Sequence, residues 1–286
     1  MNDAVHLAVG TLTMRPYVFA FFAAYLLAAV PHLGWRKTAA FTVSGYLIAF
    51  LSEWSSINNG FPYGWYFYID RTSTRELWIA GVPFFDSLSY VFLCYCSYTM
   101  ALLVLSPLKA CHGDFVTLET GVIRRSFAVL LLGSLFQAYL DIIIDPVSLQ
   151  GSRWFLGQIY GYRERGYHFG VPLSNYLGWW LVGALMILAL QRIDRLWHGN
   201  GRPTGVCSLP FRSLFGPALY VSVLAFNLTV AMLIGEWTVA MTGLFIVFLP
   251  LVMIATLTVR RLNRYTQDEL AAHLQDYPYS PAAAKR

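Results

Sequence analysis

The sequence predicts an all-α, polytopic integral membrane protein, and three observations support that fold class. The 286-residue chain is 57% hydrophobic and only 12% charged, whereas soluble domains carry about 25% charged residues. Its apolar residues gather in blocks of about 20, the length that a helix needs to cross the hydrocarbon core. The Lys and Arg residues lie mainly in the connections between these blocks. We therefore predict one transmembrane domain over residues 1–260 and a polar tail over residues 261–286.

Seven apolar blocks are the predicted spans. They cover residues 16–34, 39–57, 82–107, 125–144, 171–190, 214–234 and 237–259. Of the 20 Lys and Arg residues, 14 lie in the first, third and fifth connections and in the C-terminal tail. Because positively charged loops stay in the cytoplasm, we expect the N-terminus outside and the C-terminus inside a cell (inner) membrane. The tail is too polar to bury a core, so we expect it to be partly disordered.

The remaining composition argues against several classes of partner and cofactor. The net charge of +5 is spread over loops and forms no basic face, so nucleic acid is not an expected partner. Cys94, Cys96, Cys111 and Cys207 form no CxxC pair, and the histidines lack metal-ligand spacing. The sequence also has no phosphate-binding glycine loop and no Asp-rich diphosphate motif. We expect no cofactor and no metal, and membrane lipid as the surroundings.

Four carboxylates lie at the ends of the predicted spans. Glu53 closes the second span, Asp86 opens the third, and Asp141 and Asp145 close the fourth. An ionisable side chain is costly in a span and is therefore a candidate for function. The predicted topology puts all four near the outer ends of their helices, where they could converge on one pocket. The alternative is that each simply meets lipid headgroups and water.

The spacing of Asp141 and Asp145 predicts a particular chemistry. Residues four apart on a helix share one face and lie within about 6 Å of each other. Like charges at that distance resist joint ionisation, so we expect one carboxyl to keep its proton. A neutral acid in a dry pocket can protonate a weakly basic substrate. Alternatively, Asp141 bonds to a neighbouring helix and Asp145 caps the turn before Pro146.

The second connection is rich in aromatic residues, and residues 60–68 read GFPYGWYFY. An interfacial aromatic belt would explain the rings. The Gly and Pro residues instead favour a loop folded back to line a cavity, where irregular backbone is tolerated. Aromatic faces stabilise cations by ~0.5–2 kcal/mol each, so acids beside rings suit a reaction through a carbocation. Tyr63, Trp65, Tyr66 and Tyr68 are the predicted binding residues of this loop.

The fifth span begins with a second candidate stretch. Asn175 lies about one turn inside an apolar helix, where a polar group needs partners. It could hold a water or a loop carbonyl, or it could only join two helices. Trp179, one turn later, is predicted to flank the substrate together with the loop tyrosines.

These stretches resemble the membrane-integral carotenoid hydratases of the bisanhydrobacterioruberin hydratase and γ-carotene 1′-hydroxylase type. The likeness rests on Glu53 with residues 60–68, on residues 141–146 (DIIIDP) and on residues 170–179 (GVPLSNYLGW). That family has a Glu before a GxPxGxYxY-like loop, a WDxxxDP-like helix end and a GVPxxNxxGW-like helix start. This sequence departs from it at Leu140, where the family commonly has tryptophan, and at residues 86–89 (DSLS), which replace a more apolar stretch.

The resemblance implies a carotenoid biosynthesis enzyme, a cofactor-independent hydro-lyase of isoprenoid substrates. Such an enzyme adds water to the terminal 1,2 double bond of an acyclic (ψ) carotenoid end group, by protonation and water capture of a tertiary carbocation. On this hypothesis Asp141 or Asp145 is the general acid, and Glu53 or Asp86 orients the water and takes its proton. The expected partners are the carotenoid substrate and, beyond it, a carotenoid glycosyltransferase or other pathway enzymes that act on the new hydroxyl.

Two other functions fit the same residues. A carotenoid end-group cyclase or isomerase would share the protonation step but exclude water, so its product would keep the mass of the substrate. A lipid or pigment carrier, or a transporter, would have no catalytic step. Conservative changes such as Glu53→Gln and Asp145→Asn would then alter binding or transport and leave the pigments unchanged.

Overall fold

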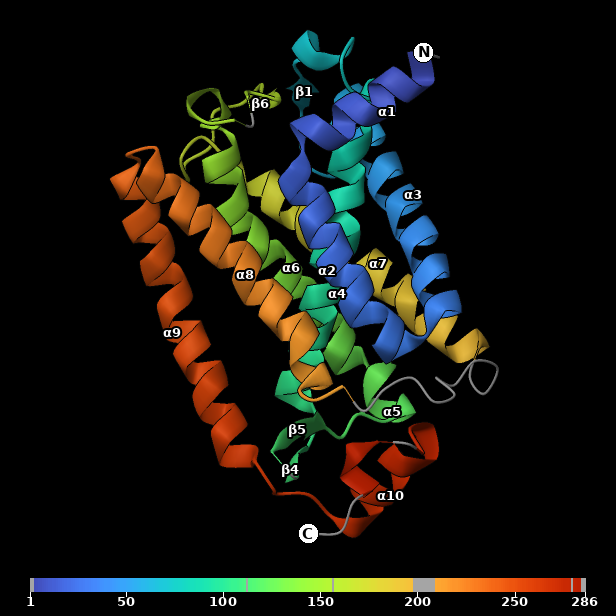
Figure 1. The fold of residues 1–286 in the computed structure, drawn as a ribbon. Helices are drawn as coiled ribbons and strands as arrows, with labels where there is room; N and C mark the ends of the chain where they lie inside the picture. The colour runs from blue at the N-terminus through green and yellow to red at the C-terminus, as the bar shows by residue number, and fades with distance from the viewer. Residues whose placement is uncertain (1–2, 112, 156, 198–208, 279, 284–286) are drawn as a thin grey trace.

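The computed structural model describes residues 3–111, 113–155, 157–197, 209–278 and 280–283. Seven long helices lie in this part of the chain, and each coincides with one predicted apolar block (Figure 1). They are α2 (Pro16–Leu33), α3 (Trp35–Asn59), α4 (Phe84–Leu105), α6 (Phe127–Ser148), α7 (Leu173–Leu196), α8 (Arg212–Leu233) and α9 (Trp237–Arg261). All except α3 are long and apolar enough to cross a membrane. The all-α membrane fold is therefore confirmed, whereas a seventh span and the orientation stay predictions.

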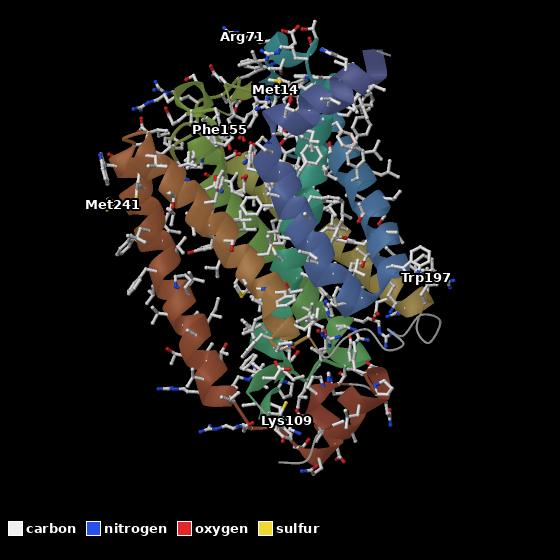
Figure 2. All side chains as sticks on the ribbon, in the orientation of Figure 1. Met14, Arg71, Lys109, Phe155, Trp197 and Met241 are labelled. Carbon is white, nitrogen blue, oxygen red and sulfur yellow. The ribbon has the colours of Figure 1, made fainter. Side chains whose placement is uncertain are left out.

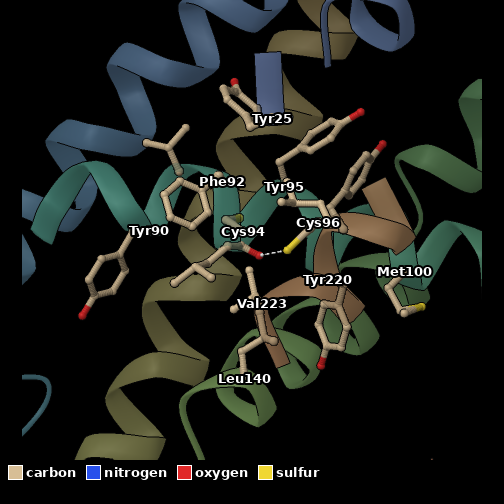
Figure 3. Close-up of a cluster of buried hydrophobic side chains, with 14 of the residues drawn as sticks. Tyr25, Tyr90, Phe92, Cys94, Tyr95, Cys96, Met100, Leu140, Tyr220 and Val223 are labelled. Carbon is tan, nitrogen blue, oxygen red and sulfur yellow. Dashed lines mark hydrogen bonds between the residues drawn. The ribbon is translucent and has the colours of Figure 1, made fainter. Parts of the chain in front are cut away.

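The helix α4 is at the centre of the bundle and packs against α2, α3, α6, α7 and α8. A helix that is apolar all round is buried on every side, and the small hydroxyl groups in the middle of α4 bond to their own helix. Ser97 and Thr99 donate to carbonyl oxygens at 2.7 and 2.9 Å. Figure 3 shows Cys94 and Cys96 among core side chains, with the Cys96 thiol donating to the carbonyl of Leu93. Both cysteines are free and buried, and they pack as small apolar residues.

The outer surface of α9 is apolar. Met241, Phe245 and Phe248 are exposed, and Phe245 keeps 84% of its surface accessible. Figure 2 shows Met241 projecting from α9 away from the other helices. An apolar surface of this kind marks contact with a membrane or another protein. Because this surface runs along a helix long enough to cross a membrane, lipid is the expected contact.

The short elements gather at two opposite ends of the bundle (Figure 1). One end carries α1 (Asp3–Met14), β1 (Tyr66–Tyr68), η1 (Asp70–Thr72), β2 (Trp78–Ile79), β3 (Val82–Pro83), η2 (Gly151–Arg153) and β6 (Tyr160–Tyr162). The other end carries β4 (Leu108–Cys111), β5 (Asp114–Thr117), α5 (Gly121–Arg124), α10 (Gln267–Asp276) and η3 (Pro281–Ala283). The strands form three two-stranded antiparallel sheets, β1–β6, β2–β3 and β4–β5. The second and fourth connections thus meet in the β1–β6 sheet.

The C-terminal tail is more ordered than its composition suggests. Thr266 and Glu269 form a capping box at the start of α10, which satisfies two backbone donors at once. His273 is fully buried, with one ring nitrogen 2.8 Å from the Glu119 carbonyl oxygen. The Lys109 ammonium group donates to the Ala282 carbonyl oxygen at 2.6 Å. Our expectation of partial disorder is wrong for the described part of the tail, because it packs onto the polar end of the bundle.

Candidate functional site

A cavity of about 110 Å³ lies at the β1–β6 end of the bundle. One water needs about 10–15 Å³ of such space, so there is room for a small apolar group together with water. Glu53, Asp86 and Asp145 line the cavity, and most of the remaining wall is aromatic. Asp141 is not among the lining residues; it is completely buried behind the wall. The fold therefore brings three of the four predicted carboxylates to one chamber.

The first polar cluster, which we call the Tyr68 group, consists of Glu53, Tyr68, Asp86 and Ser87. Glu53 lies near the end of α3 and Asp86 in the first turn of α4, so the antiparallel packing of these helices brings them together. The Tyr68 hydroxyl oxygen is 3.0 Å from Glu53 Oε1 and 2.6 Å from Asp86 Oδ2. The Ser87 hydroxyl donates a short hydrogen bond to the other oxygen of Glu53. Two carboxyl groups thus share one phenol.

The second cluster, the Asp145 group, consists of Asp141, Asp145, Tyr160, Tyr162 and Asn175. Asn175 Nδ2 donates to Asp141 Oδ2 at 2.5 Å and to Asp145 Oδ2 at 2.8 Å, so it joins α7 to both acids of α6. Tyr160 donates to Asp145 Oδ1 at 2.5 Å, and Tyr162 donates to Oδ2. Asp145 therefore does not cap the turn before Pro146, since its two oxygens accept bonds from other segments.

The β1–β6 sheet connects the two clusters. Its register pairs Tyr66 with Tyr162 and Tyr68 with Tyr160. Alternate residues of a strand point to the same face, so all four rings share one face of this sheet. Their ring centroids lie 5.3 to 6.4 Å apart in edge-to-face pairs. The four tyrosine rings thus form one layer, which closes one end of the cavity and contacts both acid clusters.

The tyrosines that bond to the acids keep their protons. Burial, followed by the charge of Asp145, raises the pKa of Tyr160 and of Tyr162 well above the ordinary value. Burial, followed by the charges of Asp86 and Glu53, does the same for the pKa of Tyr68. Each of these phenols therefore remains a neutral hydroxyl that can supply one proton to a hydrogen bond.

The other predicted binding residues divide into two sets. Tyr63, Tyr66 and Trp179 line the cavity, and Trp179 stacks on Tyr90 with ring centroids 4.2 Å apart. Trp65 lies outside it: the residue is 39% exposed, and the Arg163 guanidinium group lies over its ring, 4.6 Å from the centroid. The side chains of neighbouring residues in this loop point in opposite directions, which separates Trp65 from Tyr66.

Several site residues are not predicted by the sequence. Tyr160 and Tyr162 form a Tyr-Gly-Tyr stretch whose alternation matches Tyr66-Phe67-Tyr68 and could have indicated a paired strand. The apolar part of the wall comes from α2, α4 and α8, including Tyr17, which stacks on Phe226 at 5.5 Å. Those positions carry only the ordinary apolar pattern of a span and give no separate signal.

The charges around the site follow a simple pattern. Among the ion pairs formed by described residues, none involves Glu53, Asp86, Asp141 or Asp145. Arg15, which lies nearby, pairs with Glu76 at 2.9 Å. The acids of the site are thus held by hydroxyl and amide donors.

The described residues also bear on whether the protein could bind a metal ion. Those residues contain no group of three or more His, Cys, Asp or Glu side chains placed to hold a metal ion. Cys207, His112 and His198 lie outside the described residues.

Comparison with known proteins identifies the family. The family model described as carotenoid biosynthesis protein matches residues 11–250. The chain belongs to the carotenoid biosynthesis protein family. The match includes both acid clusters, the β1–β6 sheet and most of the helical bundle. No curated protein and no solved structure matches this carotenoid biosynthesis protein. The family assignment supports an enzymatic role in carotenoid biosynthesis, carried out by a membrane protein.

Proposed function

We propose that this protein is a carotenoid 1,2-hydratase that adds water to the terminal double bond of an acyclic (ψ) carotenoid end group. The observation that carries the proposal is the cavity at the β1–β6 end, which combines three carboxyl groups with an aromatic wall. Hydration of an unactivated alkene requires a proton donor, a stabilised tertiary cation and one admitted water. The cavity can supply all three.

The size and lining of the cavity favour entry of the end group alone. A cavity of about 110 Å³ cannot enclose a long polyene, whereas its apolar wall of Tyr17, Phe21 and Phe226 suits an isoprenoid. The rest of the carotenoid would run outward between the helices into lipid. We place the protein as a multi-pass protein of the inner membrane, with the cavity end outside.

The aromatic wall has a chemical role in this proposal. Tyr63, Tyr66 and the stacked pair of Trp179 and Tyr90 present ring faces or edges to the chamber. Aromatic faces stabilise a desolvated cation by ~0.5–2 kcal/mol each. The alkene is neutral and the tertiary cation is charged, so the rings would stabilise the cation more than the alkene. Several rings together would therefore lower the barrier to forming the cation.

Three of the four acids would contact the substrate, and the fourth, Asp141, would not. Glu53, Asp86 and Asp145 line the cavity and are proposed catalytic residues, with Asn175 beside them. Asp141 bonds to Asn175 at 2.5 Å from behind the wall. We therefore assign Asp141 as a positioning residue, which differs from the direct role that the sequence suggested for it.

The decisive experiment is expression in a bacterium that makes lycopene, followed by mass analysis of the pigments. We expect a product heavier by one water per processed end, and no such product from Asp145→Asn. The exposed Tyr167, in the connection between β6 and α7, provides the control variant Tyr167→Phe. A pigment of unchanged mass but altered absorption would indicate a cyclase or isomerase instead. Recovery of the unmodified substrate, with lycopene and with a longer acyclic carotenoid alike, would refute hydration.

Hydration would also fix the position of the protein in a reaction sequence. Its product is a tertiary alcohol, which a carotenoid glycosyltransferase or another enzyme that acts on hydroxyl groups could use. We propose such enzymes as partners in the pathway.

A further inference from the structure

The two acid clusters differ in the number of protons that their hydrogen bonds require. In the Tyr68 group, one phenol oxygen lies within hydrogen-bond distance of Glu53 and of Asp86, at 3.0 and 2.6 Å. A phenol has a single proton, so it can donate to only one of these carboxyls. The other contact needs a proton on the carboxyl itself. Two ionised carboxylates on either side of one hydroxyl would also repel each other.

The hydrogen bonds of Asp145 have the opposite character. Both of its oxygens accept bonds, one from Tyr160 at 2.5 Å and the other from Tyr162 and from Asn175 at 2.8 Å. The Asn175 amide nitrogen can only donate. Bonds from hydroxyls to an ionised carboxylate are short, at about 2.5–2.7 Å. Burial raises the pKa of Tyr160 and of Tyr162, so both phenols keep their protons and can act as donors.

On the basis of the proposed function, we infer that the Tyr68 group holds the catalytic proton and that Asp145, kept ionised by Tyr160, Tyr162 and Asn175, is the base for water. This assignment exchanges the roles that the sequence analysis gave to the two acid pairs. It also adds Tyr160 and Tyr162 as positioning residues. Both clusters line one cavity, so an alkene between them could receive a proton from one side and water from the other.

The reaction balances with these groups alone. A carboxyl proton of the Tyr68 group moves to C2 of the terminal alkene, and the π electrons form the new C–H bond and leave a tertiary cation at C1. A lone pair of the water oxygen forms the C–O bond, and one water proton passes to Asp145. The Tyr68 group has then lost one proton and Asp145 has gained one. Transfer of that proton back through cavity water restores both groups.

Hydration in deuterium oxide distinguishes this assignment from its reverse. Membranes with the wild-type protein should convert an acyclic carotenoid to an alcohol with deuterium at C2. That result establishes hydration itself, so its absence would count against the proposed function and not against the role assignment. Asp145→Asn should still protonate the alkene reversibly. Deuterium then enters the recovered carotenoid, while alcohol formation falls by about 10²–10⁴-fold.

The double variant Glu53→Gln with Asp86→Asn removes both possible proton carriers and should abolish deuterium exchange and hydration together. The assignment is overturned if this double variant keeps exchange, or if Asp145→Asn loses exchange along with hydration although its membrane level and melting temperature match the wild type.

A second pair of substitutions covers the case in which a carboxylate variant does not fold. Tyr160→Phe with Tyr162→Phe keeps every carboxyl and every ring but removes two donors to Asp145. We expect the ratio of deuterium exchange to alcohol to rise by roughly tenfold or more, the rate equivalent of one charge-assisted hydrogen bond. Tyr167→Phe, the matched control in the same connection, should leave the ratio unchanged. An unchanged ratio in the double variant would mean a purely structural role for these tyrosines and would refute their assignment.

Discussion

The two ends of the helical bundle both bury acidic side chains, but they hold them in different ways. At the cavity end, Glu53, Asp86 and Asp145 are bonded by tyrosine, serine and asparagine. At the opposite end, Asp194 lies 2.7 Å from the Lys37 ammonium group and 3.3 Å from the Arg124 guanidinium group. A buried charge is tolerated when a countercharge offsets its desolvation, so this second end is suited to holding the fold.

Glu119 is a second example of a buried acid at this end. Its carboxylate pairs with the His32 ring at 2.9 Å, and its carbonyl oxygen accepts from the buried His273 of the C-terminal tail. Asp194 and Glu119 are thus held by basic side chains. The acids that line the cavity are bonded instead to neutral hydroxyl and amide donors, whereas Glu76 at the same end is paired with Arg15 and does not line the cavity. We propose that this difference in partners, and not the number of carboxylates, distinguishes the catalytic end from the structural one.

The largest expected effect is on hydration activity, when an aspartate is replaced by asparagine at one end or at the other. Asp145→Asn should reduce hydration by about 10²–10⁴-fold with little change in the amount of folded protein, because the amide can still accept from Tyr160. Asp194→Asn should leave the activity per folded molecule close to the wild type. Pigment mass analysis, normalised to the protein level in membranes, measures both. Equal losses of specific activity in the two variants would remove the distinction between the ends.

The next effect concerns stability at the ion-paired end. Asp194→Asn removes the anion that Lys37 and Arg124 share and leaves Arg124 with Asp276, and removing one partner of a buried pair costs on the order of 3–5 kcal/mol. We expect a clearly lower melting temperature in detergent and less protein in membranes. Glu164→Gln, at an exposed position, is the control. A melting temperature like that of the wild type would show that the cations find other partners.

A pH titration of stability tests Glu119. Burial alone would raise the pKa of this carboxyl, but His32, Arg124 and Arg212 outweigh burial and lower the pKa from 4.5 to about 2. A lowered folded-state pKa stabilises the fold above the unfolded-state pKa, and this contribution is lost as the pH falls from about 4.5 toward 2. The melting temperature should therefore drop in that interval. Glu119→Gln should weaken that drop, and an identical pH dependence in the variant would contradict the assignment.

The smallest effect is expected at the cap of α10. Thr266 accepts from the Glu269 backbone amide at 3.2 Å, and replacing such a cap with alanine costs about 1 kcal/mol. Thr266→Ala should loosen the C-terminal tail and leave hydration intact, since α10 lies at the end opposite the cavity (Figure 1). Limited proteolysis of the tail, compared with pigment analysis, measures both. A loss of hydration would show that the two ends are coupled.

The sequence alone determined the positions of the long apolar helices and the main candidates for function. Long apolar blocks must become helices in a membrane, because hydrocarbon offers no partner for backbone polar groups. Carboxylates are costly in such blocks, and this cost singles out Glu53, Asp86, Asp141 and Asp145 by their positions in the chain. The family comparison supports a carotenoid biosynthesis role on the same stretch of chain.

The tertiary structure decided which of these side chains meet and which partners they have. Strand pairing brings Tyr160 and Tyr162 to Asp145, and this contact joins segments whose separate patterns do not specify each other. The same packing leaves Trp65 outside the cavity and Asp141 behind its wall. The fold also buries His273 of the tail against the bundle. Hydropathy is a local property of the chain, whereas hydrogen-bond partners depend on distances across the fold, so only the folded chain could settle them.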